Sequence, residues 1–192
     1  MAAVGMRYLV GAQIKTETDG VVPVYDKGLK IGRAVSATVT FTRNDAKLYV
    51  DDVLGERDNT ITGGNVDITV AEILDEVAEK LFGDTKSSDE TGDYYDSSAS
   101  SPYIGMGYMQ EVRVKGVTKY RTTWLYKVQL APADSQAQTK GETTQFQTQR
   151  VTGEMMGVSM ADGSTRFRAR NEFEKAEEAI KWLNTKANIT AE

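Results

Sequence analysis

Two stretches decide the fold of this chain, Ala34-Val-Ser-Ala-Thr-Val-Thr-Phe-Thr42 and Asn65-Val-Asp-Ile-Thr-Val70. Apolar and polar residues alternate in both, which predicts two strands that each have one apolar face and one polar face. An antiparallel sheet with one side on a core and the other side in solvent is therefore predicted. The polar face consists of Ser36, Thr38, Thr40 and Thr42 from the first strand, with Asp67 and Thr69 from the second.

The connection between these strands, residues 43–64, is far longer than a hairpin needs. Structureless loops above about 12–15 residues are uncommon in compact domains and are often functional. This predicted loop carries apolar residues that an idle surface loop would not need. Its central run is Leu48, Tyr49, Val50, Asp51, Asp52, Val53 and Leu54. The composition indicates a loop that contacts another molecule, such as a second copy of the chain.

The remainder of the chain predicts a mainly β, α+β fold in one domain over residues 1–192. Strand patterns cover 7–16, 103–114, 117–130, 144–159 and 164–170, and further polar loops are expected at 84–102 and 131–143. Within 117–130, alternation places Tyr120, Thr122, Trp124, Tyr126, Val128 and Leu130 on one face. Since aliphatic residues share that face, Trp124 is expected in the core and not on a stacking platform.

Two helices are expected against this sheet. Apolar residues at helical spacing follow the sequence Thr69-Val-Ala-Glu72, which resembles a capping box, and Gly83 is placed to end that helix. A second helix is expected to open at Asn171 or Glu172 and to continue toward the C-terminus. Each has one apolar stripe, as expected of a helix that covers a sheet.

The bulk composition is that of a soluble globular chain, with 40% hydrophobic and 27% charged residues. The formal net charge of −5 argues against a protein that coats DNA. No apolar run approaches the roughly 20 residues of a membrane helix, so no membrane role is expected. Residues 1–7 lack the basic region and apolar core of a signal peptide.

Catalysis is not expected, because the chain has neither histidine nor cysteine. Ser-His-Asp and Cys-His arrangements are therefore impossible, and the commonest metal ligand is missing. The adjacent carboxylates Asp51 and Asp52 would point to opposite sides of an extended segment, so a catalytic pair is not predicted. The acidic run 89–96 lacks the ligand spacing of an EF-hand loop. No catalytic, cofactor or metal site is predicted.

Three arginines, Arg166, Arg168 and Arg170, share one face of a predicted strand. Such a row could hold nucleic acid. The acidic character of the whole chain favours instead an exposed strand face, or a partner for acidic loops of a neighbouring subunit.

Three segments carry a resemblance to a known family, and together they span most of the chain. The first is residues 1–8 with Gly28-Leu-Lys-Ile-Gly-Arg-Ala34 and the strand to Thr42. The second is Arg43-Asn-Asp-Ala-Lys-Leu-Tyr-Val-Asp-Asp52 with Asp58-Asn59, Gly63-Gly64 and the elements to Leu81. The third is Phe173-Glu-Lys-Ala-Glu-Glu-Ala-Ile-Lys-Trp-Leu-Asn184. In these segments the chain resembles the major tail proteins, or tail-tube subunits, of siphophages that infect Gram-positive bacteria.

The resemblance implies a β-sandwich-like subunit with a packed helix, which assembles as hexameric rings that stack into a tail tube. Inner sheets would join into one β-barrel, and DNA would pass through its lumen without specific binding. The polar face defined above would line the lumen, and residues 48–54 would bind an adjacent subunit. Further implied partners are the tape-measure, tail-tip and tail-terminator proteins. The implied location is the virion, after assembly in the host cytoplasm.

Two other functions remain open from the sequence. A monomeric β-sandwich binding module would use the acidic and aromatic loop 84–103 as its ligand site. A hydrolase without histidine has the least support. A strict monomer in solution would favour the binding module over the tail tube.

Overall fold

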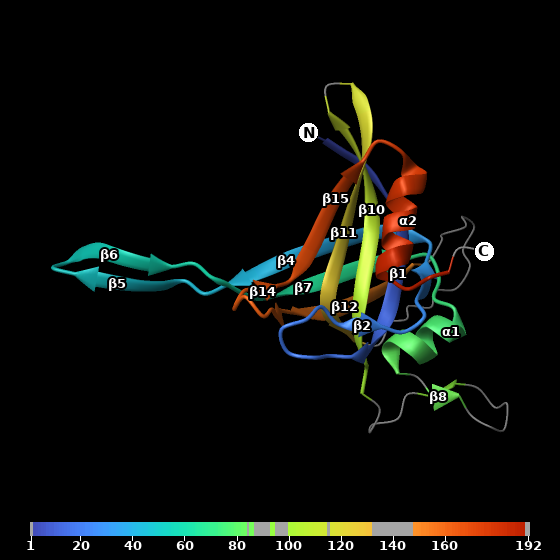
Figure 1. Cartoon of the computed structure of the whole chain (residues 1–192), viewed down its shortest axis with the longest axis horizontal. Helices are drawn as coiled ribbons and strands as arrows, with labels where there is room; N and C mark the ends of the chain where they lie inside the picture. Colours follow the sequence, from blue (N-terminus) through green and yellow to red (C-terminus); the bar gives the residue numbers. More distant parts are fainter. Residues whose placement is uncertain are drawn as a thin grey trace, which may run out of the picture.

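Long antiparallel strands form the body of the protein (Figure 1). The computed structural model describes residues 2–83, 85–86, 93–94, 100–114, 116–131 and 148–190. The predicted mainly β, sandwich-like α+β fold is confirmed. Among the described residues, neither helical segment has the length and apolar character needed to cross a membrane.

The strands are β1 (Ala2–Thr16), β2 (Val24–Tyr25), β3 (Leu29–Gly32), β4 (Ala34–Arg43), β5 (Ala46–Val50), β6 (Val53–Asp58), β7 (Ile61–Val70), β8 (Thr85–Lys86), β9 (Asp93–Tyr94), β10 (Tyr103–Val114), β11 (Val117–Leu130), β12 (Gln149–Met156), β13 (Val158–Ser159), β14 (Thr165–Arg166) and β15 (Arg168–Phe173). The helical segments are α1 (Asp75–Val77), continued by the π-helical turn η1 (Ala78–Phe82), and α2 (Ala176–Lys186).

The main sheet is an open path of antiparallel strands whose two ends are connected through the chain. Its order is β1-β10-β11-β12-β7-β4, and β3 pairs back onto β1. Only Arg33 separates β3 from β4, so the chain itself connects the two ends of this path, while β4 pairs with β7 alone among the described strands. Gly32 marks the bend with φ of 151°, and a Cβ there would lie 2.5 Å from the Glu72 carbonyl oxygen. Glycine is needed at this corner because it alone fits both the backbone conformation and the close approach.

Two cores lie on the two sides of β10 and β11. The first core lies on one side of these strands and includes Ile68, Met106, Leu125 and Val128, with residues of α1 and η1 against it. The second core lies under α2 and includes Tyr25, Trp124, Tyr126, Ala179 and Leu183. The central strands are therefore buried on both sides, and each helical segment covers a different side of the sheet.

One predicted face of β11 is divided between these cores. Trp124 and Tyr126 lie in the second core, as expected of buried aromatics, but Val128 and Leu130 lie in the first. The cause is an extra residue in β11, because Met106 pairs with Leu125 while Ile104 pairs with Val128. Such a bulge shifts the alternation by one residue, so the prediction of a single continuous face is wrong.

Both predicted helix starts are also wrong. Thr69 and Val70 belong to β7, where Thr69 pairs with Ser36, so they form no capping box. Helical structure begins instead at Asp75, and Gly83 ends it in the left-handed conformation, as predicted. The C-terminal helix begins at Ala176, because β15 continues through Phe173 by pairing with β11. In both places strand pairing overrides the local helical pattern.

Gly107 provides a stability test of the second core. A Cβ at this position would lie 2.6 Å from Trp124 Cε3 and 2.8 Å from Leu183 Cδ2. Gly107→Ala should therefore lower the free energy of unfolding by about 1–3 kcal/mol, the usual cost of overpacking. The matched control is Gly5→Ala on the neighbouring strand, where nothing lies within 4 Å of the added Cβ. Urea unfolding of both variants gives the comparison, and equal midpoints would contradict this packing.

Candidate functional site

Residues 46–58 form a β-hairpin that projects from one side of the body, and we call it the arm (Figure 1). Strand β5 pairs with β6 from Ala46–Asp58 to Val50–Val53. Asp51 and Asp52 make the turn with φ of 50° and 61°, the signs that a type I′ hairpin turn requires. The prediction of a loop over 43–64 is therefore wrong for most of this segment. Figure 1 shows the turn at the end of the arm farthest from the body.

The base of the arm is held by polar contacts. Asp45 accepts from Arg57 Nε at 2.6 Å and lies 3.4 Å from Lys47 Nζ. Asp58 accepts from Asn44 Nδ2 at 3.0 Å and from the Thr60 backbone N–H at 3.1 Å. The hydrogen bond from Arg57 lowers the pKa of Asp45, and the side-chain hydrogen bond from Thr60 lowers that of Asp58. These contacts tie the two strands of the ribbon to each other at its base.

The outer half of the arm exposes apolar side chains. Tyr49 lies opposite Leu54, and Val50 lies opposite Val53. Adjacent strand residues point to opposite sides, so each face of the ribbon carries one of these pairs. Their exposed fractions are 63% for Tyr49, 47% for Leu54, 53% for Val50 and 68% for Val53, and Leu48 is 55% exposed. An isolated two-stranded hairpin is marginally stable in water, so these residues indicate a binding surface.

The structure brings the predicted polar face together on β4 and β7. Ser36, Thr38, Thr40 and Thr42 are exposed, while the alternate residues Ala37, Val39 and Phe41 are half-buried against the first core. Thr38 lies opposite Asp67, and Ser36 lies opposite Thr69. A role in lining a lumen stays a prediction for these six residues.

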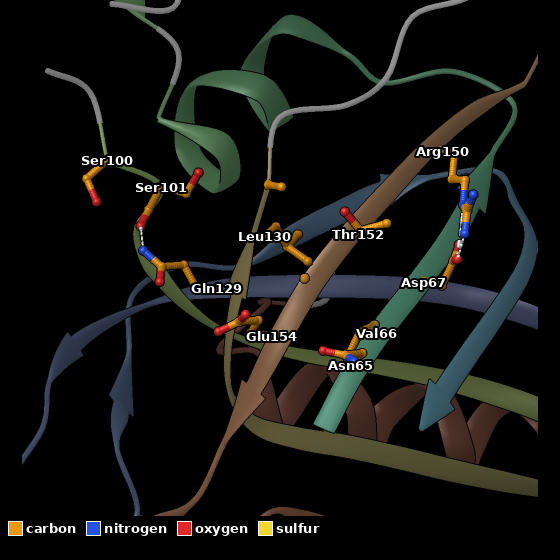
Figure 2. Close-up of a pocket in the computed structure, with 12 residues that line it drawn as sticks. Asn65, Val66, Asp67, Ser100, Ser101, Gln129, Leu130, Arg150, Thr152 and Glu154 are labelled. Carbon is orange, nitrogen blue, oxygen red and sulfur yellow. Dashed lines mark hydrogen bonds and ion pairs between the residues drawn. The ribbon is translucent and has the colours of Figure 1, made fainter. Parts of the chain in front are cut away.

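Strand β12 extends this polar face, which sequence reasoning missed. Thr152 lies opposite Asp67, and Arg150 lies opposite Thr69. Figure 2 shows that Arg150, Thr152 and Glu154 come from β12 beside Asn65 and Asp67 of β7, around a hollow of about 700 Å³. The alternation of polar residues at 150, 152 and 154 is the sequence signal that could have found them.

Charges on the polar face are nearly balanced. Arg150 Nε lies 3.1 Å and 3.0 Å from the two carboxylate oxygens of Asp67, as Figure 2 shows. This hydrogen bonding lowers the pKa of Asp67, which therefore stays ionised at neutral pH. Glu154 adds a negative charge. A polyanion that meets this face finds its arginine already engaged by a carboxylate.

The structure divides the predicted row of three arginines between two strands. Arg168 and Arg170 lie on β15, and Arg166 lies on β14, 3.8 Å from Asp162. Of the alternative binding loop 84–103, residues 84, 87–92 and 95–99 lie outside the described residues. Residues 132–143 of the third predicted loop also lie outside them. In the part of the chain that the structure describes, no group of three acidic side chains is arranged to hold a metal ion.

Two comparisons with known proteins gave no match. No protein-family model matches the chain, and no curated protein matches its sequence significantly. The arm and the polar face are therefore the features of the molecule that bear on its function.

Proposed function

We propose that this chain is a tail-tube subunit, a structural virion protein whose copies form hexameric rings that stack into a conduit for DNA. The arm carries this proposal. It places five exposed apolar side chains on a ribbon that projects away from the body (Figure 1). A monomer gains nothing from such a projection, whereas a polymer can bury it against the next copy.

The open edge of β4 supports the proposal. This strand of ten residues ends the pairing path and pairs with β7 alone among the described strands. A long unpaired edge offers backbone N–H and C=O groups to another strand, which a monomer has to protect against. In a ring, the sheet of the next subunit would satisfy this edge, and a closed barrel would leave no edge exposed.

The polar face of β4, β7 and β12 is suited to the inner wall of such a barrel. It is rich in threonine and serine, and the arginine on it pairs with Asp67. Affinity for DNA comes mainly from lysine and arginine that neutralise phosphates. A wall without free cations would let DNA slide through. The tape-measure, tail-tip and tail-terminator proteins are the further partners that this function requires.

Electron microscopy of the purified full-length chain tests the function. At high protein concentration we expect rings or hollow tubes with a central channel. Sedimentation velocity over a range of concentrations should show the same assembly as a growing population of fast-sedimenting species. A chain that remains strictly monomeric at every concentration would contradict the proposal, and so would solid fibrils without a channel.

A further inference from the structure

The turn of the arm carries negative charge that its own ribbon leaves unbalanced. Both cations of the arm, Lys47 and Arg57, are engaged with Asp45 at its base. Asp51 and Asp52 have no cationic partner within the described part of the chain. They are flanked by the exposed Val50 and Val53. A partner for this turn therefore has to offer positive charge beside an apolar surface.

A site with that chemistry lies on β15. Arg168 and Arg170 are both exposed, and they face the same side of the sheet. The Arg168 guanidinium lies 4.6 Å from the centre of the Phe41 ring. Neither arginine has a carboxylate partner among the described residues, whereas the nearby Arg121 donates to Glu172 at 2.9 Å. Partial burial lowers the pKa of Arg168, and the charge of Arg170 lowers it further.

A buried hydroxyl beside this pair also lacks a partner. Thr123 lies directly opposite Arg170 on β11 and is 1% exposed. Its Oγ1 makes no hydrogen bond within the described structure. Cross-strand neighbours project from the same face, so this hydroxyl points toward the arginine side. Buried polar groups are nearly always hydrogen-bonded, so an unpaired hydroxyl beside Arg170 is an exception within this sheet.

We propose that the Asp51–Asp52 turn of one copy docks on the Arg168–Arg170 site of a second copy. The proposal rests on the proposed function and names the surface that receives the arm. Two unpaired carboxylates would meet two unpaired guanidinium groups, which bind carboxylates in a bidentate geometry. Val50 and Val53 would meet the half-buried rings of Phe41 and Phe167.

The contact has to join different copies. In Figure 1 the turn lies at the far end of the arm, whereas β15 belongs to the body. The donor and acceptor surfaces are also different patches of one chain. Such a head-to-tail contact repeats from copy to copy and generates either a closed ring or an open filament. The docking proposed here therefore propagates assembly and does not stop at a dimer.

Charge reversal tests the docking. Asp51→Lys/Asp52→Lys and Arg168→Glu/Arg170→Glu should each weaken self-association at least about tenfold, as losses of close interfacial charge pairs do. Combining the four substitutions in one chain restores opposite charges, so this variant should regain most of the association. The matched control, Lys15→Glu/Arg113→Glu, makes the same charge change at exposed positions away from β15 and should associate like the unmodified chain. Sedimentation velocity of the full-length proteins at low salt measures all four.

The results for the reversed pairs and the unmodified chain separate the docking from the tube function. Normal assembly of the two reversed pairs would overturn the docking and leave the tube function standing, whereas a monomeric unmodified chain would overturn both. Failure of the combined variant to recover would also overturn the docking, provided that thermal unfolding shows it folded. Arg168→Gln/Arg170→Gln keeps the test valid if the glutamates unfold the sheet. If duplex DNA is retarded by the unmodified chain and not by this glutamine variant, with assembly unchanged, the arginines bind nucleic acid instead.

Discussion

Replacing Leu48 to Glu56 by Asn-Gly, which then joins the paired residues Lys47 and Arg57, is expected to leave a folded monomer that forms neither rings nor tubes. The change removes the exposed apolar side chains and the acidic turn together. Asn-Gly closes the remaining strand ends because it favours the type I′ turn. Every residue of β5 and β6 is exposed, so the body should lose at most about 0.5 kcal/mol of its unfolding free energy. Electron microscopy and urea unfolding measure the two effects separately.

Exposed valines elsewhere provide a control for lost apolar surface. Val21→Ser/Val117→Ser changes two valines that are each 57% exposed and lie off the arm, so assembly should be unaffected. Tyr49→Ser/Val53→Ser removes one residue from each face of the ribbon and should weaken assembly strongly. Tubes of normal appearance from the shortened chain would show that the arm is dispensable, and the proposed function would lose its main support.

The strands that alternate most regularly were predicted best from the sequence. Strand β4 lies where the pattern placed it, β7 includes the predicted 65–70 but begins earlier at Ile61, and their register puts Thr38 opposite Asp67. When apolar and polar residues alternate and one face of the strand is buried, the pairing register is specified. A shift of the pairing by one residue would move the apolar side chains from the core to the solvent. The share of β12 in the same face was missed, although its polar residues alternate too.

The arm and the bulge in β11 could not be predicted in the same way. The arm turns at Asp51 and Asp52, a pair without the glycine that usually marks a two-residue turn, and its flanks are apolar on both faces. The bulge opposite Ile104 and Met106 is a property of strand pairing, so one strand alone gives no sign of it. Local sequence patterns were therefore sufficient to predict strands with one buried apolar face and one solvent-exposed polar face. They were insufficient for strands whose two faces have the same polarity.

Trp124→Ala is expected to have the largest effect on stability. Trp124 is fully buried and meets Tyr25 edge-on, with 5.2 Å between ring centres. Its Nε1 donates to the Tyr25 hydroxyl at 3.3 Å, and that hydroxyl donates to the Tyr126 carbonyl oxygen at 2.8 Å. Truncation leaves a large cavity and breaks this chain of hydrogen bonds. The unfolding free energy should fall by about 3–5 kcal/mol, as for other buried aromatics.

The chain has one other tryptophan, which makes a matched control. Trp182 on α2 is half-buried and lies 6.4 Å from Phe173 between ring centres, so Trp182→Ala should cost clearly less. Trp124→Phe keeps much of the volume but loses the Nε1 donor, and its cost should fall between the two. Urea unfolding followed by circular dichroism compares the three variants. If Trp182→Ala proves the more damaging, the second core depends on the outer side of α2 and not on the edge-on contact of Trp124 and Tyr25. A Trp124→Ala chain that still folds in the cold should assemble normally, because its arm and the β15 arginines are unchanged.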